Sequence, residues 1–407
     1  MGETAVIPAQ IVGVAARSLL ANNTNAEAAC QTVSFATAST GHVLTVQSDG
    51  SVAFAAVSAG VGGSTGSTDN LVLRADGAGG ATLQNSGWLI PDIYTASPNA
   101  TVNHLSLQAT GSTTNVSVSI VPKGTGAFSL AVPDGTSAGG NARGTSAVDL
   151  RTASRSAATD VASGLQSFLG PFGGSATQSY CISFGGNATG AYGISFGEFC
   201  TASGQRSIVM GGYLLTASGN GSVAIGGETH TASGLNSAVY GGNTNTASAE
   251  NAGVFGGRNA VADRFSMLAH SAGRFAANGD CQRVAFHLRN KTTDGTTAVT
   301  LFLDGSSARL TIPSGKILSG IVEILGSRST GAEVAVYTRH VAIKNVGGTT
   351  TLVGTVDTIG VDTAAGTTIA ITADDTNDAL QIAVTGVASQ TWRWEAEFRG
   401  LELAYGT

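Results

Sequence analysis

One segment occurs four times in the middle of the chain, as Thr201-Ala202-Ser203-Gly204, Thr216-Ala217-Ser218-Gly219, Thr231-Ala232-Ser233-Gly234 and Thr246-Ala247-Ser248-Ala249. They begin at residues 201, 216, 231 and 246, so the repeat is 15 residues long. A second marker, an apolar residue followed by two glycines, keeps the same spacing at Met210-Gly211-Gly212, Ile225-Gly226-Gly227, Tyr240-Gly241-Gly242 and Phe255-Gly256-Gly257. Earlier copies, spaced by 12 residues, are Phe172-Gly173-Gly174, Phe184-Gly185-Gly186 and Phe196-Gly197-Glu198. Two markers in one register indicate a repeat architecture.

Each repeat has the length of one coil of a β-solenoid. A unit of 12 to 15 residues holds two strands of about four residues and two tight turns, because a strand residue rises roughly 3.3 Å. The paired glycines follow the last strand residue, where the chain must turn sharply, and glycine adopts positive φ without strain. We therefore predict structural turns at Gly185, Gly186, Gly211, Gly212, Gly226, Gly227, Gly241, Gly242, Gly256 and Gly257.

The strand between the two markers has no charged face. In Ser222-Val223-Ala224-Ile225, Val223 and Ile225 share one face, and Ser222 and Ala224 share the other. Strands that are apolar or small on both faces are typical of burial on both sides. A narrow roll covers only one face of each strand, so the other face needs a partner. We expect this partner to be a copy of the chain around a symmetry axis, in a homotrimer.

The repeat also resembles a known family pattern. The unit Gly-x-x-Ser-x-Ala-x-Gly, present as Gly219–Gly226, is similar to the head repeat of trimeric autotransporter adhesins, which also occurs in bacteriophage tail fibres. The resemblance covers residues 139–265. It implies a left-handed parallel β-roll in which three chains pack together, and by itself it does not separate an adhesin from a phage fibre.

The segments on either side of the repeat favour a phage fibre. An adhesin would begin with a signal peptide, but Glu3 stands where the basic region would lie. An adhesin would also end in a membrane-spanning barrel segment, whereas the last strand carries four charged residues on one face, which cannot face lipid. Six other segments resemble parts of phage and prophage fibre proteins: residues 71–77, 121–128, 140–150, 303–313, 372–380 and 392–394.

The chain is predicted to be an all-β, elongated trimeric fibre. Residues 1–40 are the expected virion-attachment segment, within which Ile11–Ala21 could form a short helix. Small β modules are expected over 41–135, and 136–165 holds the junction and the first coils. The β-roll shaft is expected over 166–265, a connector over 266–280, and a C-terminal antiparallel β-sandwich or jelly roll over 281–407, where nine short strand patterns alternate with turn residues.

Composition excludes several classes of protein. Charged residues make up 11% of the chain, against about 25% in an average soluble domain. The net charge of −6 and the lack of a Lys/Arg run argue against a nucleic-acid partner. No stretch approaches the roughly 18 apolar residues of a transmembrane helix, so no membrane insertion is expected. The cysteines, Cys30, Cys181, Cys200 and Cys281, are far apart and are expected to be free thiols.

Few side chains suggest chemistry, and no cofactor or metal is expected. Asp374, Asp375 and Asp378 could chelate a hard cation, but we expect them to cap a turn between strands. His230 occupies the repeat position of Leu215 and Asn245, where three copies in a trimer could meet and bind an ion. An exposed turn residue is the expected structure at this position.

The last strand pattern carries two glutamates on one face. Glu395 and Glu397 are two residues apart, as a glycosidase pair might be. Arg393 and Arg399 alternate with them, so a salt-bridged solvent face is the expected structure. Trp392 and Trp394 share the opposite face and are expected to anchor a core or an interface. As candidates for a receptor surface we name Tyr337, Arg339 and His340.

These observations predict a structural virion protein with no enzymatic activity. A depolymerase would need a groove of paired carboxylates, whereas Glu198, Glu228 and Glu250 are the only acids of residues 166–262. The N-terminus is expected to bind other virion proteins, and the distal C-terminal domain a host surface receptor such as a polysaccharide. The alternatives are a capsid-decorating fibre or spike without a receptor role, and a secreted bacterial adhesin.

Overall fold

The computed structural model describes residues 119–407 except 153–154, 294, 296 and 406–407, together with the backbone of seven strands nearer the N-terminus. The chain divides into two units, Met1–Ile120 and Val121–Thr407. Every regular element among the described residues is a β-strand, which confirms the all-β prediction. None of the described residues forms a helix long and apolar enough to cross a membrane.

In the first unit, the described strands pair antiparallel in three small groups. Strand β1 pairs with β2, β3 pairs with β4, and β6 lies between β5 and β7. The helix expected over residues 11–21 is wrong at its end, because Ser18–Ala21 is a strand whose backbone pairs with a neighbour; residues 11–17 lie outside the described residues. The strands are β1 (Ser18–Ala21), β2 (Gln31–Ser34), β3 (His42–Val46), β4 (Val52–Ala56), β5 (Leu71–Ala75), β6 (Leu83–Leu89) and β7 (Gln108–Ala109).

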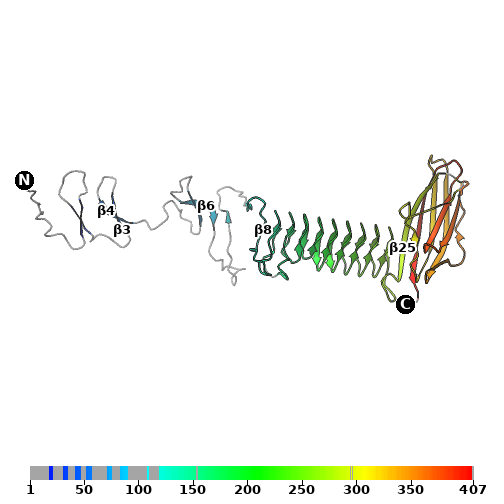
Figure 1. The fold of residues 1–407 in the computed structure, drawn as a ribbon, viewed down its shortest axis with the longest axis horizontal. Coiled ribbons are helices and arrows are strands. Elements are labelled where there is room, and N and C mark those ends of the chain that lie inside the picture. Colours follow the sequence, from blue (N-terminus) through cyan, green and yellow to red (C-terminus); the bar gives the residue numbers. More distant parts are fainter. Residues whose placement is uncertain are drawn as a thin grey trace, which may run out of the picture. The chain divides into compact units, whose positions relative to one another are not determined.

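The second unit begins with a parallel β-solenoid, which confirms the fold expected from the repeats (Figure 1). We call it the roll. Its long-sheet strands are β8 (Phe128–Ser129), β9 (Val148–Asp149), β10 (Phe168–Leu169), β12 (Ile182–Phe184), β14 (Ile194–Glu198), β16 (Ile208–Tyr213), β18 (Val223–Ile225), β20 (Ala238–Tyr240), β22 (Gly253–Phe255) and β24 (Leu268–His270). Its short sheet holds β11 (Ser175–Ala176), β13 (Asn187–Ala188), β15 (Thr201–Ala202), β17 (Thr216–Ala217), β19 (Thr231–Ala232), β21 (Thr246–Ala247) and β23 (Val261–Ala262). Equivalent repeat residues pair across neighbouring coils, as Thr216 does with Thr231.

The interior of the roll is lined by small side chains from both sheets. Val209, Ala224 and Val239 face inward from the long sheet, and Ala217 and Ala232 face inward from the short sheet. All five are fully buried. Because strand side chains alternate between faces, the residues on either side of each of these point outward. The narrow interior explains why the repeat is built from alanine, serine, glycine and valine.

The two glycines of a pair have different physical roles. Gly226 and Gly227 both have positive φ, at +64° and +76°. A Cβ on Gly226 would meet no atom within 4 Å, whereas a Cβ on Gly227 would lie 2.3 Å from the Gly242 carbonyl oxygen and 2.5 Å from His230 Nε2. The first glycine therefore serves only the turn, and the second also makes room for the next coil. Positive φ occurs at all the predicted turn glycines except Gly186.

The long sheet continues from the roll into the C-terminal domain, because β24 pairs antiparallel with β25. Its strands there are β25 (Cys281–Thr292), β28 (Lys316–Arg328), β29 (Val334–Val346), β30 (Thr349–Leu352), β31 (Asp357–Thr358) and β34 (Trp392–Ala404). A second sheet, the end sheet, holds β26 (Val299–Thr300), β27 (Leu310–Thr311), β32 (Thr368–Asp374) and β33 (Ala379–Thr385). Both sheets contribute to one core, in which the indoles of Trp392 and Trp394 stack with ring centroids 5.7 Å apart.

A buried ion cluster lies at each end of the roll. Near its start, the Asp149 carboxylate accepts a hydrogen bond from Arg143 Nε at 2.7 Å and lies 3.5 Å from Arg155. Where the roll meets the C-terminal domain, the fully buried Glu402 pairs with Arg264, and Lys316 Nζ lies 2.6 Å from its carboxylate. These ion pairs link strands to the loops that close the roll.

Candidate functional site

The outer face of the long sheet carries two uncharged rows along the roll. The first row is Phe168, Ile182, Ile194, Ile208, Val223, Ala238, Gly253 and Leu268, and the second is Phe184, Phe196, Met210, Ile225, Tyr240 and Phe255. We call these rows the apolar rows. Met210, Tyr240, Phe255 and Leu268 are between 42% and 58% exposed, which is high for large apolar side chains. Contiguous exposed apolar surface of this kind marks an interaction site.

Aromatic side chains stack along the apolar rows. The ring centroids of Phe184 and Phe196 lie 4.8 Å apart, and those of Tyr240 and Phe255 lie 5.4 Å apart. This stacking follows from the parallel register, which places equivalent residues on neighbouring coils. The rows are therefore regular in shape as well as apolar.

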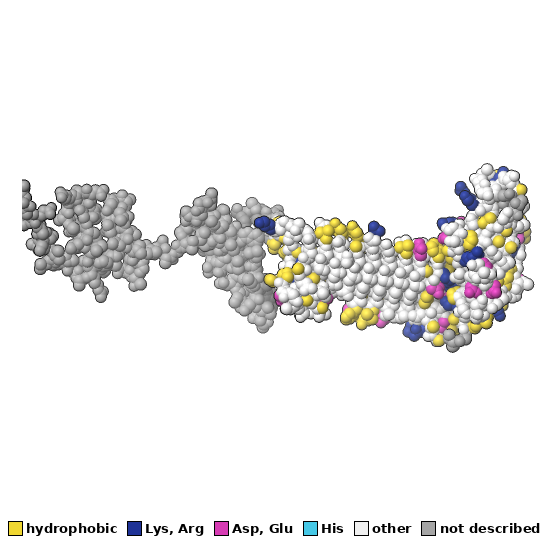
Figure 2. All heavy atoms as spheres, in the orientation of Figure 1, with side chains coloured by type: hydrophobic (Ala, Val, Ile, Leu, Met, Phe, Trp, Pro, Cys, Tyr) yellow, Lys and Arg dark blue, Asp and Glu magenta, His cyan; other side chains and the backbone are white. Residues whose placement is uncertain are grey.

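The short sheet has a different outer surface. Threonines and serines of the Thr-Ala-Ser segments face outward there, with the serines exposed and the threonines half-buried, as at Thr216 and Ser218. Only the long sheet thus presents an apolar outer face. In Figure 2, uncharged surface covers most of the roll, and acidic and basic side chains gather over the C-terminal domain.

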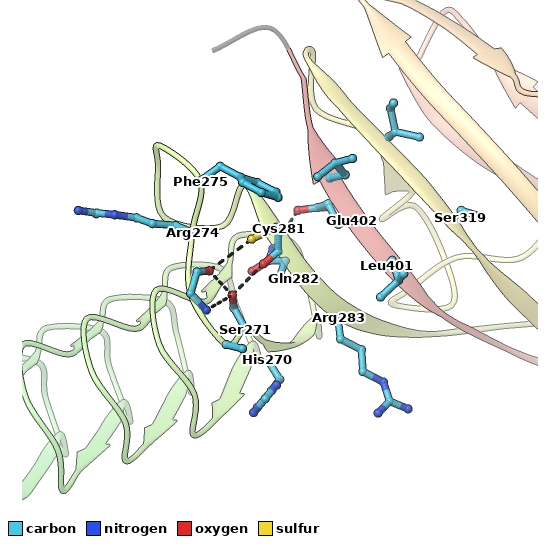
Figure 3. A pocket seen from close by; sticks show the side chains of 14 residues that line it. His270, Ser271, Arg274, Phe275, Cys281, Gln282, Arg283, Ser319, Leu401 and Glu402 are labelled. Carbon is cyan, nitrogen blue, oxygen red and sulfur yellow. Dashed lines mark hydrogen bonds between the residues drawn. The ribbon is translucent and has the colours of Figure 1, made fainter.

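A pocket of about 670 Å³ lies where the roll meets the C-terminal domain (Figure 3). Phe275, in the loop that follows β24, lies on one side of the pocket and Leu401 on the other. Ile317 and Leu403 also line it. The Cys281 thiol also lines the pocket. Phe275 is 79% exposed and Leu401 is 65% exposed, so the lining is largely apolar and open to solvent. No sequence pattern predicted this pocket, because the contributing segments are far apart in the chain.

The loop that forms the wall is fixed by one carboxylate. Asp280 accepts backbone hydrogen bonds from Phe275, Ala276 and Ala277, at distances between 2.6 and 3.1 Å. Burial alone would raise the pKa of Asp280, but these N–H groups outweigh it and lower the pKa to about 2. The Ser271 hydroxyl adds a hydrogen bond to the Cys281 carbonyl oxygen at 2.8 Å. The pocket is therefore preformed.

A polar cluster lies on the same face of the C-terminal domain. His287 Nε2 lies 2.7 Å from Glu395, and Arg399 pairs with both Glu323 and Glu397. These side chains line a shallow hollow of about 420 Å³. The expected salt-bridged face is therefore present, although the partner of Glu395 is His287. No group of side chains among the described residues could hold a metal ion.

The three receptor candidates occupy different environments. Tyr337 is 3% exposed and its hydroxyl lies 2.7 Å from Thr367 Oγ1, so its ring belongs to the core. Arg339 forms two hydrogen bonds of 2.7 Å with Asp362, which raise the pKa of Arg339 and lower that of Asp362. Of the three, His340 is exposed.

The expectation for His230 is wrong. The side chain is fully buried in the roll, and its Nδ1 accepts a hydrogen bond from the Asn245 backbone N–H at 3.2 Å. Burial lowers the pKa of this imidazole, although the nearby carbonyl groups of Gly241 and Gly242 oppose the shift. The equivalent positions of successive repeats form a column of side chains inside the roll, so His230 is a structural residue.

Of the three aspartates expected to cap a turn, Asp374 does so, because its carboxylate accepts a hydrogen bond from the Asn377 N–H at 3.2 Å. Asp375 Oδ1 accepts the Thr350 N–H at 2.6 Å, and the Asp378 carboxylate accepts the Thr350 hydroxyl at 2.7 Å. Asp374 pairs with Arg309 at 3.0 Å. Asp375 and Asp378 therefore connect the turn between β32 and β33 to Thr350 on β30.

No family model and no curated protein matches the chain. Similar solved structures include the tailspike gp49 of Acinetobacter baumannii bacteriophage Fri1, described as a capsular polysaccharide depolymerase, and the tailspikes of Acinetobacter phage vB_ApiP_P1 and A. baumannii phage AM24. Their sequence identities are 8%, 11% and 9%, with TM-scores of 0.20, 0.20 and 0.19. The matches cover 57%, 63% and 64% of this chain, and only 46%, 59% and 62% of the tailspikes.

The comparison corrects one prediction. We predicted no enzymatic activity from the scarcity of acids in the roll, whereas the Fri1 tailspike is a depolymerase of capsular polysaccharide. The prediction that the chain is not an enzyme is therefore withdrawn. The likeness assigns no residue of this chain a role in catalysis. All three neighbours are phage tailspikes.

Proposed function

We propose that this protein is a homotrimeric fibre or spike of a bacteriophage virion that attaches the particle to the host surface. The N-terminal region attaches to the virion, the roll forms the shaft, and the C-terminal domain faces the host. Three identical sites on one fibre gain affinity through avidity without any new type of contact.

The observation that carries the proposal is the contrast between the two outer faces of the roll. The long sheet exposes the apolar rows, and the short sheet exposes hydroxyl groups, as at Thr216 and Ser218. A parallel sheet is normally covered on both faces. A partner for the apolar rows must be straight and must repeat at the spacing of the coils, about 4.8 Å. A second and a third copy of the chain meet both conditions.

Host contact is assigned to a loop of the C-terminal domain. The loop between β31 and β32 holds Val361, which is 96% exposed, and Ile359, which is 43% exposed. The Arg339–Asp362 ion pair fixes this loop, and Thr363 forms a backbone bridge with Val336. Loops held on a rigid β scaffold are common places for binding surfaces. Arg339 therefore stabilises the loop whose exposed side chains form the contact surface.

The test uses the full-length protein. Native mass measurement should give a trimer, and Ile225→Asp in the apolar rows should give a monomer, because three carboxylates would have to be buried together. The wild-type trimer should bind host cells and compete with phage adsorption. Purified host polysaccharide should be incubated with the protein at the same time, and its chain length measured, so that binding and cleavage are recorded separately. A wild-type monomer, or a trimer that does not compete with adsorption, would overturn the proposal.

A further inference from the structure

The apolar outer face does not stop at the end of the roll. Strand β25 follows β24 in the same sheet, with Leu268 opposite Ala285. Beyond it, the outer face of the C-terminal domain carries seven branched aliphatic side chains: Ile317, Ile321, Leu325, Val334, Val336, Leu401 and Leu403. Six of them are between 39% and 65% exposed, and Ile317 is half-buried. We call this surface the distal face.

The opposite side of the C-terminal domain has no such residues. On the outer face of the end sheet, β32 presents Thr368, Ala370 and Thr372, and β33 presents Gln381 and Thr385. The same difference separates the short sheet from the long sheet in the roll. One side of the unit therefore exposes large apolar side chains along the long sheet, interrupted on the C-terminal domain by the polar cluster of His287 and Arg399, and the other side carries small polar groups.

We infer that the distal face, with the junction pocket, docks against a second copy of this chain. The inference rests on the proposed trimer and extends its interface from the roll into the C-terminal domain. A copy that lies along the apolar rows reaches the distal face next, because one unbroken sheet carries both. The copy therefore covers Leu401 and fills the pocket between Phe275 and Leu403.

The acidic groups of this face do not oppose the arrangement. Arg399 pairs with Glu323 and Glu397, and His287 lies 2.7 Å from Glu395, so these acids already have partners within the chain. Arg283 and Arg393 are exposed on the same face. Charges that are paired before association cost less to cover than unpaired ones. Both signs occur on the face, so a copy related by symmetry presents complementary charges.

A trimer with the distal face buried leaves only part of the C-terminal domain accessible to solvent. If the distal face is covered, His340 lies on the covered side, because it points outward from the long sheet. The end sheet and the loop that holds Val361 remain open to solvent. Host contact then belongs to these open parts.

The test compares the accessibility of two single cysteines in the full-length protein. Leu401→Cys reports on the distal face and Thr372→Cys, on the end sheet, is the matched control. Both positions are exposed in the single chain, so both substitutions are mild. Each protein is labelled with a maleimide, and the reaction at each new cysteine is followed by peptide mass spectrometry, which separates it from the native thiols.

We expect Leu401→Cys to react at least about tenfold more slowly than Thr372→Cys in a protein of trimer mass, and at the same rate in urea. Equal rates in the native trimer would overturn this inference and leave the proposed function standing. Slow labelling of Leu401→Cys only in whole virions would assign the face to another virion protein, which also overturns it. A monomer mass for both variants and the wild type would overturn the proposed function itself.

Discussion

Gly226 and Gly227 are neighbours with the same sign of φ, so replacing each by alanine separates the two roles of a glycine pair. Gly226→Ala forces a side chain into the left-handed region, which costs about 1–2 kcal/mol, and its Cβ meets nothing within 4 Å. Gly227→Ala carries the same cost and adds a Cβ 2.3 Å from the Gly242 carbonyl oxygen. The next coil must move away, and the hydrogen bond from the Glu228 N–H to the Gly242 carbonyl, 3.1 Å long, is lost.

Loss of that hydrogen bond adds about 0.5–1.5 kcal/mol. We therefore expect a destabilisation of about 1–2 kcal/mol for Gly226→Ala and about 1.5–3.5 kcal/mol for Gly227→Ala. Urea unfolding at equal chain concentration, followed by far-ultraviolet circular dichroism, measures both. Equal losses for the two variants, or a larger loss for Gly226→Ala, would show that the next coil does not lie against Gly227. Gly226→Asn should lose less than Gly226→Ala, because asparagine tolerates positive φ better.

Three other substitutions test the buried polar groups. Burial lowers the pKa of His230, so the imidazole is neutral in the folded protein. The free energy of unfolding should therefore be fully retained above the ordinary histidine pKa of 6.5 and should fall as the pH drops below that value. Urea unfolding between pH 7.5 and 5 should lose this pH dependence in His230→Asn, a substitution that the roll should accept because Asn245 fills the same position one coil later. Asp149→Asn should destabilise the protein by about 3–5 kcal/mol, because two buried guanidinium groups lose their counter-ion. The control is Glu333→Gln, which breaks an exposed ion pair and should cost at most about 1 kcal/mol. Equal losses for the two variants would contradict the prediction. Glu402→Gln should cost a similar amount and should split thermal unfolding into two transitions by calorimetry, whereas a single unshifted transition would mean that Glu402 does not couple the roll to the C-terminal domain.

The sequence predicted the roll well because the repeat spacing sets the register directly. Residues 15 positions apart, such as Thr216 and Thr231, pair across neighbouring coils as the two markers require. The same spacing did not show which columns are interior. His230 was expected at an exposed turn, but its side chain packs against the second glycine of a pair, since a Cβ on Gly227 would lie only 2.5 Å from His230 Nε2. The repeat period shows which residues occupy equivalent positions in neighbouring coils. It does not show whether their side chains point inward or outward, because that depends on the geometry of the turns.

The C-terminal domain was predicted less well, because its long strands contain glycine. The sequence indicated nine short strand patterns over 281–407, whereas the observed strands include long ones such as β28, which spans Lys316–Arg328. Gly326 lies under the Trp394 ring, where a Cβ would be 2.4 Å from the indole. Such a glycine is required by packing from a distant strand, but in the sequence it is indistinguishable from a turn residue. The junction pocket depends on similar long-range contacts and left no local signal.

The direction of the hydrogen bonds in the roll has a mechanical consequence. Both sheets connect one coil to the next, so their hydrogen bonds lie along the shaft and tension along the shaft loads them directly. Each coil boundary is held by strand pairs only two or three residues long, as between β18 and β20 or β19 and β21. A 15-residue coil that opens releases about 50 Å of chain in place of a rise of about 4.8 Å. Under a steady pull the shaft would lengthen coil by coil, so that it would absorb work as an extensible tether while each remaining coil kept its fold.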